Sequence, residues 1–365
     1  MLVVSAAPRK SPTRMSPLGC YCMYPGYSSL SSVRCAMSKR RASHAGSWYS
    51  SRRADLSAQL QSWMDQADVS CGGARAIIAP HAGYSYSGPT AAWAYRHINP
   101  EGVRRVFVLG PSHHVHLAGC ALTRCIAYQT PLGELPIDQP LCAELLATGD
   151  FETMDLSVDE EEHSIEMHLP YIQQVMGDQP FTLVPILVGA LSQASQSRYG
   201  EILAPFLGNA QNLIIISSDF CHWGKRFRFT HRDNACQYIY QSIEALDRQG
   251  MELIEKQASL TLPWCPYATP HFSYMPHPTF PICHRFLVFF WQDANGFSRY
   301  QHEFKNTICG QFPIAVLLQA LERANQQRKH TLRFVKYDQS NKVVKASGSS
   351  VSYASAVVWC NDGEL

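Results

Sequence analysis

The sequence lacks several features that mark specialised classes of protein. No apolar run comes near the roughly 20 residues that a membrane-spanning helix needs, since residues 286–291 form the nearest candidate and are far too few. None of the 13 cysteines forms a CxxC pair, which argues against a ribbon-type zinc site. The formal net charge is only +2, so neither nucleic acid nor an anionic membrane is expected as the main partner.

The beginning of the chain is also short of acidic residues and of regular pattern. Residues 1–43 contain no Asp or Glu and show no helical or strand period. A disordered extension, a mitochondrial transit peptide and a wrongly assigned start upstream of Met37 all fit, and we favour the wrongly assigned start. A charged stretch followed by a long apolar one is missing, so no secretory signal is expected and the thiols should be reduced, in an intracellular compartment.

From residue 44 onward, short apolar runs alternate with helical patterns. Strands are predicted at residues 74–79, 105–109, 181–188, 212–216, 333–337 and 351–359, and helices at 91–98, 141–147, 164–176, 199–207, 234–247 and 312–321. This alternation predicts βαβ units and a mostly parallel central sheet flanked by helices. The expected organisation is one α/β domain over residues 40–361, after an extension at 1–39 that is disordered or wrongly included.

One segment interrupts this order. Residues 262–298 are rich in Pro and contain Cys265, Cys283 and several histidines, but their spacing matches no metal site. A structureless loop of this length is uncommon inside a compact domain. We expect an insertion without a role in the core, or a retained untranslated segment.

Three predicted strands are followed directly by residues that can bind a metal or transfer a proton. His81 follows the first strand, His113 the second, and Asp219 and His222 the fourth. Ligands bind beyond the carboxyl ends of parallel strands, so these side chains are expected to share one site. A single His after a strand is more often structural than functional. Three such strand ends favour a site, without separating metal binding from acid–base chemistry.

A cysteine far along the chain adds a soft ligand. Cys309 precedes an apolar helical run, and a helix N-terminus favours the thiolate. Imidazole and thiolate ligands suit Fe, Cu and Zn. Two neighbours have simpler interpretations, because His114 should point away from its neighbour His113, and Cys221 should be packing.

Two further stretches are candidates for walls of the same pocket. On a helix, Glu162 and Glu166 would share a face, with His163 beside Glu166. They either orient the histidines or simply complement a helix dipole. The stretch from His44 to Tyr49 is either a second wall or a turn that packs Trp48 into the core.

Several long motifs together resemble the MEMO family, the mediators of ErbB-driven motility. They lie at residues 44–49, 77–84, 109–114, 162–170, 185–190, 217–224 and 306–310. The resemblance covers about residues 40–261 and 299–360. It implies a fold similar to the class III extradiol dioxygenases of the LigB type. It also implies cytoplasmic and nuclear locations, copper or iron binding, and motility signalling through phosphotyrosine receptors and the cytoskeleton.

The resemblance also implies roles for individual residues. His81, His113 and Cys309 would be the metal ligands, and Asp219 and His222 would line the pocket, with His222 at the acid/base position of the dioxygenases. Those enzymes use two His and one carboxylate on Fe(II), so a Cys in place of the carboxylate argues against ring cleavage.

Three functions follow as hypotheses. The first is a copper- or iron-dependent redox protein in which Asp219 and His222 handle protons. The second is a metal-independent adaptor that binds phosphotyrosine peptides, with Arg226 and Arg228 pairing the phosphate unless they form only an exposed basic turn. The third is a hydrolytic zinc enzyme, which ranks last.

Overall fold

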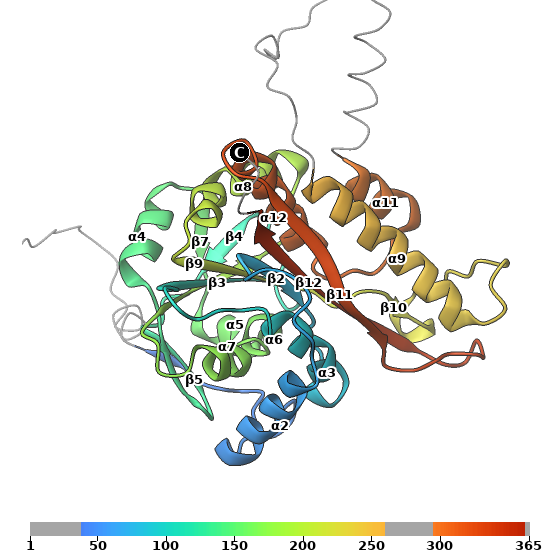
Figure 1. The fold of residues 1–365 in the computed structure, drawn as a ribbon, viewed down its shortest axis with the longest axis horizontal. Helices are drawn as coiled ribbons and strands as arrows, with labels where there is room; N and C mark the ends of the chain where they lie inside the picture. Colours follow the sequence, from blue (N-terminus) through green and yellow to red (C-terminus); the bar gives the residue numbers. More distant parts are fainter. Residues whose placement is uncertain (1–37, 260–294, 362–365) are drawn as a thin grey trace, which may run out of the picture.

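A mixed β-sheet with helices on both faces forms the centre of the molecule in the computed structural model, which describes residues 38–259 and 295–361 (Figure 1). The strand order is β10-β12-β2-β9-β3-β8-β4-β7, and β11 pairs with β12. The strands are β2 (Ala76–Ala79), β3 (Arg105–Pro111), β4 (Cys120–Leu122), β7 (Phe151–Thr153), β8 (Thr182–Val188), β9 (Asn212–Ser217), β10 (His222–Trp223), β11 (His330–Gln339) and β12 (Ser350–Cys360).

The four adjacent strands β2, β9, β3 and β8 run parallel to one another. Antiparallel β12 closes one side of this group and antiparallel β4 the other. The parallel strands are nearly continuous apolar runs because helices cover both of their faces. The predicted α/β class with a mostly parallel sheet is therefore confirmed. Strands β4 and β7 were not predicted, since three residues carry too little period to be recognised.

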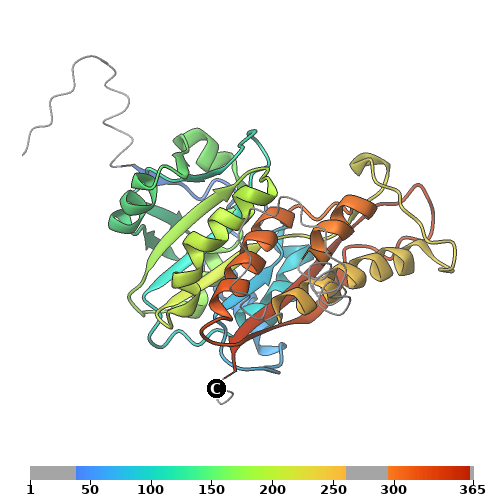
Figure 2. The same cartoon turned by 90° about the horizontal axis from the view of Figure 1, so that it is seen from above.

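Two groups of helices sandwich this sheet. On one face, α8 (Gln193–Gly208) packs against α12 (Gln311–Ala324), and α9 (Ile239–Ala258) and α11 (Gly296–Phe304) lie beside them (Figure 2). On the other face, α3 (Tyr84–Tyr95) contacts β2 and β12, backed by α2 (Arg53–Asp65) and α7 (Leu169–Met176), while α6 (His163–Glu166) lies against β3. The remaining elements are α4 (Gln139–Ala147), α5 (Leu156–Glu161), the 3-10 turn η1 (Lys225–Phe227), and a small sheet of β1 (Lys39–Arg40), β5 (Ala127–Thr130) and β6 (Gly133–Pro136).

Four predicted helices differ clearly in extent. Helix α8 runs from Gln193 to Gly208 and so begins six residues before its predicted start at residue 199. Helix α3 begins at Tyr84, seven residues before its predicted start at residue 91, and α9 runs from Ile239 to Ala258 where residues 234–247 were expected. The predicted helix over 164–176 is two helices, α6 and α7, with Pro170 in the first turn of α7. Proline lacks the N–H that would continue the preceding helix, so it begins a new one.

Parts of the expected extension and insertion lie outside the described residues, namely 1–37 and 260–294. Lys39 and Arg40 form β1, which pairs with β5, and residues 296–298 already belong to α11. Within the described ranges, no helix combines the length and the apolar character needed to cross a membrane.

Candidate metal centre

The two predicted histidines meet at one edge of the sheet. His81 follows β2 and His113 follows β3, and β9 lies between these two strands and ends just before Asp219. Because the three strands are parallel, their carboxyl ends share an edge. The ring centroids of His81 and His113 are 5.2 Å apart. The expected convergence of separate strand ends is therefore confirmed.

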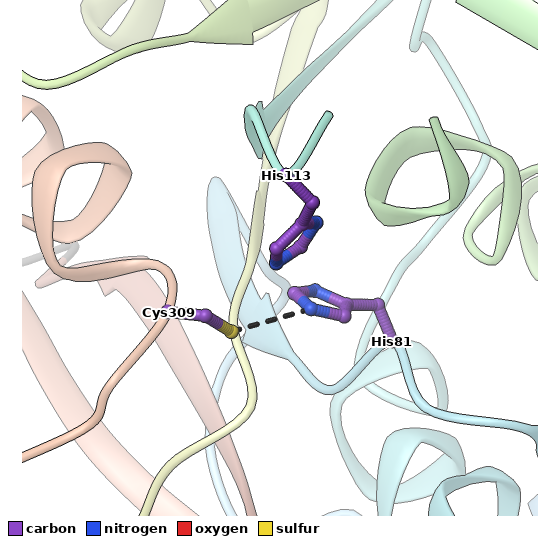
Figure 3. A group of neighbouring side chains, drawn as sticks. All are labelled: His81, His113 and Cys309. Atoms are coloured by element: carbon purple, nitrogen blue, oxygen red, sulfur yellow. Dashed lines mark hydrogen bonds between the residues drawn. The ribbon is translucent and has the colours of Figure 1, made fainter. Parts of the chain in front are cut away.

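Cys309 approaches the same point from the turn before α12. Its Sγ lies 3.2 Å from Nε2 of His81 (Figure 3). His81, His113 and Cys309, called here the His–His–Cys group, each offer a donor atom within 4.8 Å of the other two. The next residue is Gly310, where an added Cβ would lie 2.4 Å from the carbonyl oxygen of Ser217. Only glycine allows this close approach, which brings the cysteine to the strand ends.

Each imidazole is held by a partner on its Nδ1 side. Ser217 Oγ donates to the carbonyl oxygen of Ser164 at 2.6 Å, so it accepts from Nδ1–H of His81, also at 2.6 Å. The Glu162 carboxylate accepts from Nδ1–H of His113 at 2.9 Å and from its backbone N–H at 2.7 Å. Both contacts leave a lone pair on Nε2, the tautomer that a metal-binding histidine requires.

Electrostatics favour the neutral imidazole and oppose a free thiolate. Burial lowers the pKa of His81 well below its ordinary value, and the neighbouring histidine charges lower it further. Burial also raises the pKa of Cys309 well above its ordinary value, followed by repulsion from Asp219. These effects outweigh the N–H groups of Asp219 and Gly310, so the expected thiolate-favouring helix end does not decide this pKa. A cation would supply the missing positive charge, so the donor set fits a copper or iron ion.

Asp219 and His222 lie beside the His–His–Cys group. Asp219 Oδ1 accepts from the backbone N–H of His81 at 2.9 Å, and burial raises the pKa of this carboxyl. Nδ1 of His222 lies 2.9 Å from the carbonyl oxygens of Phe220 and Thr307, which makes it the protonated nitrogen. Nε2 of His222 is then the nitrogen that can accept a proton.

The acidic stretch around Glu162 does not form the continuous helix that was predicted. Glu162 has extended backbone between α5 and α6, so it shares no helix face with Glu166, and that prediction was wrong. Glu162 holds His113, whereas Glu166 accepts from both the backbone N–H and Nδ1 of His44 at 2.9 Å. The interpretation that these carboxylates orient histidines therefore agrees with the geometry, although each orients a different histidine: Glu162 orients His113 and Glu166 orients His44.

A wall of rings extends from the His–His–Cys group toward the surface. His163 stacks on His113 with ring centroids 4.5 Å apart, and Trp48 lies 4.6 Å beyond His163. Trp48 is 36% exposed, so the alternative that it packs into the core is wrong. His113, Glu162 and His163 also form a second group that could hold a metal ion. The sequence singled out His163 only as a neighbour of Glu166, because ring stacking across elements leaves no local signal.

Cys221 and the two arginines lie as their simpler interpretations predicted, whereas His114 does not point away from the other rings, because its ring centroid lies 6.1 Å from that of His163, which stacks on His113. His114 is exposed and outside the His–His–Cys group, and Cys221 is fully buried against a small apolar cluster around Trp223. Arg226 and Arg228 are exposed in and just after η1. Ser217 was missed as the partner of His81; its place at the last residue of β9 was the available signal.

Comparison with known proteins finds a matching family profile and close relatives for this chain. The sequence profile described as Memo-like protein matches residues 40–262 and 291–357. Protein MEMO1 of Danio rerio is 45% identical over 322 residues, covering 87% of this chain and 97% of that protein. Protein memo-1 homolog of Caenorhabditis elegans is 45% identical over 323 residues, covering 88% of this chain and 82% of that protein. For Protein MEMO1 of Homo sapiens the identity is 42% over 322 residues, covering 87% and 97%.

Among solved structures, an uncharacterized protein from Escherichia coli K12 aligns with a TM-score of 0.39 and 14% identity, over 76% of this chain and 98% of that one. The profile match and the relatives at 42–45% identity each cover most of the chain. The chain belongs to the Memo-like protein family.

Proposed function

We propose that the His–His–Cys group binds copper or iron and that the protein acts in redox chemistry linked to cell motility and receptor tyrosine kinase signalling. The observation that carries the metal proposal is the convergence of three donor atoms from three separate elements, within 4.8 Å of one another. Ser217 and Glu162 orient the two rings with their free nitrogens available. The signalling part rests on the family resemblance, as do cytoplasmic and nuclear locations and partners among cytoskeletal signalling proteins.

Asp219 and His222 would handle protons beside the metal. A bound copper or iron ion would supply one-electron redox chemistry. His222 offers Nε2 as a proton acceptor because two carbonyl oxygens hold its other nitrogen. Asp219 fixes the backbone at His81 and keeps its carboxyl near this site. Ring cleavage of the dioxygenase kind is not expected, since Cys309 stands where those enzymes have a carboxylate.

Metal analysis of matched variants tests the proposal. His113→Ala removes one donor, whereas His114→Ala changes the exposed neighbour outside the His–His–Cys group. Each protein is stripped, reloaded with copper or iron, passed through a desalting column and analysed for bound metal. We expect one ion per chain for the wild type and His114→Ala, and a loss of most metal for His113→Ala. Equal metal in both variants would contradict the proposal.

Turnover is tested separately from binding. Loaded wild type and His222→Ala are compared in assays of superoxide production and in a screen of catechols. Because His222 lies outside the His–His–Cys group, His222→Ala should keep its metal and lose proton-coupled activity. Metal loss in this variant would assign His222 to binding instead.

The alternative is a metal-independent adaptor for phosphotyrosine peptides, and two exposed groups favour it. Trp48 is 36% exposed at the end of the ring wall. Arg226 is exposed, and its guanidinium lies 4.5 Å from the ring centroid of Phe227. The ring centroid of Phe227 lies in turn 5.3 Å from that of His222. A guanidinium near aromatic rings suits a phosphorylated aromatic side chain.

A peptide titration decides between the two functions. A fluorescent phosphotyrosine peptide is titrated into metal-stripped wild type, Arg226→Ala and the control Arg232→Ala, whose side chain is also exposed. The adaptor function predicts binding without metal that Arg226→Ala weakens and Arg232→Ala does not. An absence of binding at high micromolar protein would eliminate it.

A further inference from the structure

A buried acid in the middle of α9 has no part in the proposed metal group. Asp247 is completely buried, and its carboxylate has four partners: the backbone N–H of Cys221 and the side chains of Asn306, Tyr337 and Ser352. Oδ1 accepts from the backbone N–H of Cys221 at 3.3 Å and from Nδ2 of Asn306 at 2.9 Å, while Oδ2 accepts from the hydroxyl of Tyr337 at 2.9 Å. Burying a carboxylate is costly even with such partners, so its presence needs a reason.

Two of these partners belong to the segments that carry site residues. Cys221 lies between Asp219 and His222, and Asn306 lies three residues before Cys309. A single carboxylate oxygen therefore bridges two segments that are far apart in the sequence. The other two partners, Tyr337 on β11 and Ser352 on β12, belong to neither segment.

The two segments are joined again closer to the site. Thr307 Oγ1 accepts from the backbone N–H of His222 at 2.7 Å. The backbone N–H of Asp219 lies 3.3 Å from the sulfur of Cys309. The contacts therefore form a continuous series that runs from Asp247 to the sulfur, although the buried Oδ1 of Asn306 has no partner in it.

We propose that Asp247 is a positioning residue of the metal centre, which holds the Cys221 and Asn306 segments together so that the Cys309 sulfur stays directed at His81. This inference rests on the proposed metal function. Partners outside the ligand set that fix ligand geometry commonly change metal affinity by about 10- to 100-fold when they are removed.

The electrostatic setting supports a role beyond folding. Burial raises the pKa of Asp247 to about 6. The titratable groups that face it are the thiol of Cys221 and the hydroxyls of Tyr300 and Tyr337, and burial raises the pKa of each. The guanidinium of Arg248, next along α9, lies 5.4 Å from the ring centroid of Tyr337. Ionisation of this carboxyl therefore costs stability, so folding alone does not explain the charge.

Three substitutions separate positioning from general packing. Asp247→Asn keeps the shape and one acceptor oxygen but loses the charge that strengthens both bonds to the segments. Asp247→Ala removes the bridge altogether. Tyr337→Phe is the control, since it removes a bond to the same carboxylate, together with the hydroxyl's contacts to Ser352 and Gln339, and none of these bonds is to the Cys221 or Asn306 segment.

Two readouts of the full-length protein test the proposal. Cobalt(II) chloride is titrated into the stripped protein, and the near-ultraviolet band of the cobalt–thiolate bond reports the sulfur directly. Iodoacetamide then alkylates metal-free protein, and mass spectrometry of the Cys309 peptide gives the rate. We expect cobalt affinity to fall about threefold for Asp247→Asn and about tenfold or more for Asp247→Ala, with faster alkylation in both. Tyr337→Phe should match the wild type in both readouts.

The outcomes distinguish this inference from the function on which it rests. If Asp247→Ala shows the same cobalt–thiolate titration and the same alkylation rate as the wild type, the positioning role is overturned. Equal losses in Tyr337→Phe and Asp247→Ala would also overturn it, because they would indicate a general loosening of the core. If wild-type protein retains neither copper nor iron after desalting, the metal function fails, and the alkylation rates alone then decide whether Asp247 fixes the sulfur.

Discussion

Glu162→Gln is the substitution that most directly probes how the fold prepares His113 for a metal. The carboxylate accepts three hydrogen bonds: two from His113, through Nδ1 and the backbone N–H, and one from the backbone N–H of Ser164 at 2.8 Å. Its side chain is only 2% exposed, so water cannot replace a lost partner. The carboxyl has a pKa lowered to about 2, because these hydrogen bonds outweigh the effect of burial.

The expected losses of stability and metal affinity in Glu162→Gln follow from the number of hydrogen-bond acceptors that a glutamine side chain offers. A glutamine amide has one oxygen and one NH2 group, so one carboxylate oxygen is replaced by a donor. The amide oxygen is expected at the Oε1 position, where two donors converge, and the NH2 then faces the backbone N–H of His113. One buried N–H is left unsatisfied, which costs about 1–3 kcal/mol. The loss of charge behind the ring should weaken metal binding by about 10- to 100-fold.

Both quantities can be measured with a close control. Glu161→Gln makes the same chemical change one residue earlier, at an exposed side chain. Metal affinity comes from competition with a chromophoric chelator, and the free energy of unfolding from urea titration of the stripped proteins. Wild-type metal affinity in Glu162→Gln would refute the orientation of His113 by Glu162, even if the stability falls. Equal effects of the two substitutions would refute it as well.

Other substitutions test the surroundings of the site. Burial raises the pKa of Asp247 in the folded protein to about 6, against an ordinary value of 3.8, so the wild type should lose about 3 kcal/mol of unfolding free energy as pH rises from about 4 to 6. Asp247→Asn should remove this pH dependence, and urea unfolding of both proteins across the same pH range checks it. Gly310→Ala would place a Cβ 2.4 Å from the carbonyl oxygen of Ser217, so a loss of about 1–3 kcal/mol is expected in urea unfolding, and wild-type stability would contradict the close approach. Arg40→Met removes the fully buried cation 2.6 Å from Glu166, which should cost about 3–5 kcal/mol; a loss below about 1 kcal/mol in the same assay would show that the buried pair is dispensable.

The sequence was most informative where local pattern and function coincide. His81 and His113 stand directly after short apolar runs, and the rule that parallel strands share an edge was enough to bring them together. Cys309 was placed through the family resemblance, and its position before an apolar helical run agreed with that placement. Strand positions and the class of the sheet followed from the same local signals.

Contacts between distant segments could not be read in this way. Gly88 and Pro89 argue locally against a helix, yet both lie in α3, where a Cβ on Gly88 would be 2.3 Å from the ring of Trp63 in α2. The glycine is a packing requirement that only the folded chain reveals. Glu162 likewise has a helical neighbourhood in sequence, but its hydrogen bonds to His113 hold it in extended backbone.

These distant contacts also indicate when the site forms. Each member of the His–His–Cys group has a protein partner of its own: Ser217 for His81, Glu162 for His113, and the backbone N–H of Asp219 for Cys309. A site whose ligands are oriented by the fold exists before the metal arrives, unlike small zinc domains that fold only when the metal binds. Metal binding should therefore raise the stability of an already folded chain in proportion to ligand concentration and affinity, while the stripped protein keeps its sheet. On the proposed function, a bound metal would serve chemistry at the strand ends, while the core beneath them carries the fold.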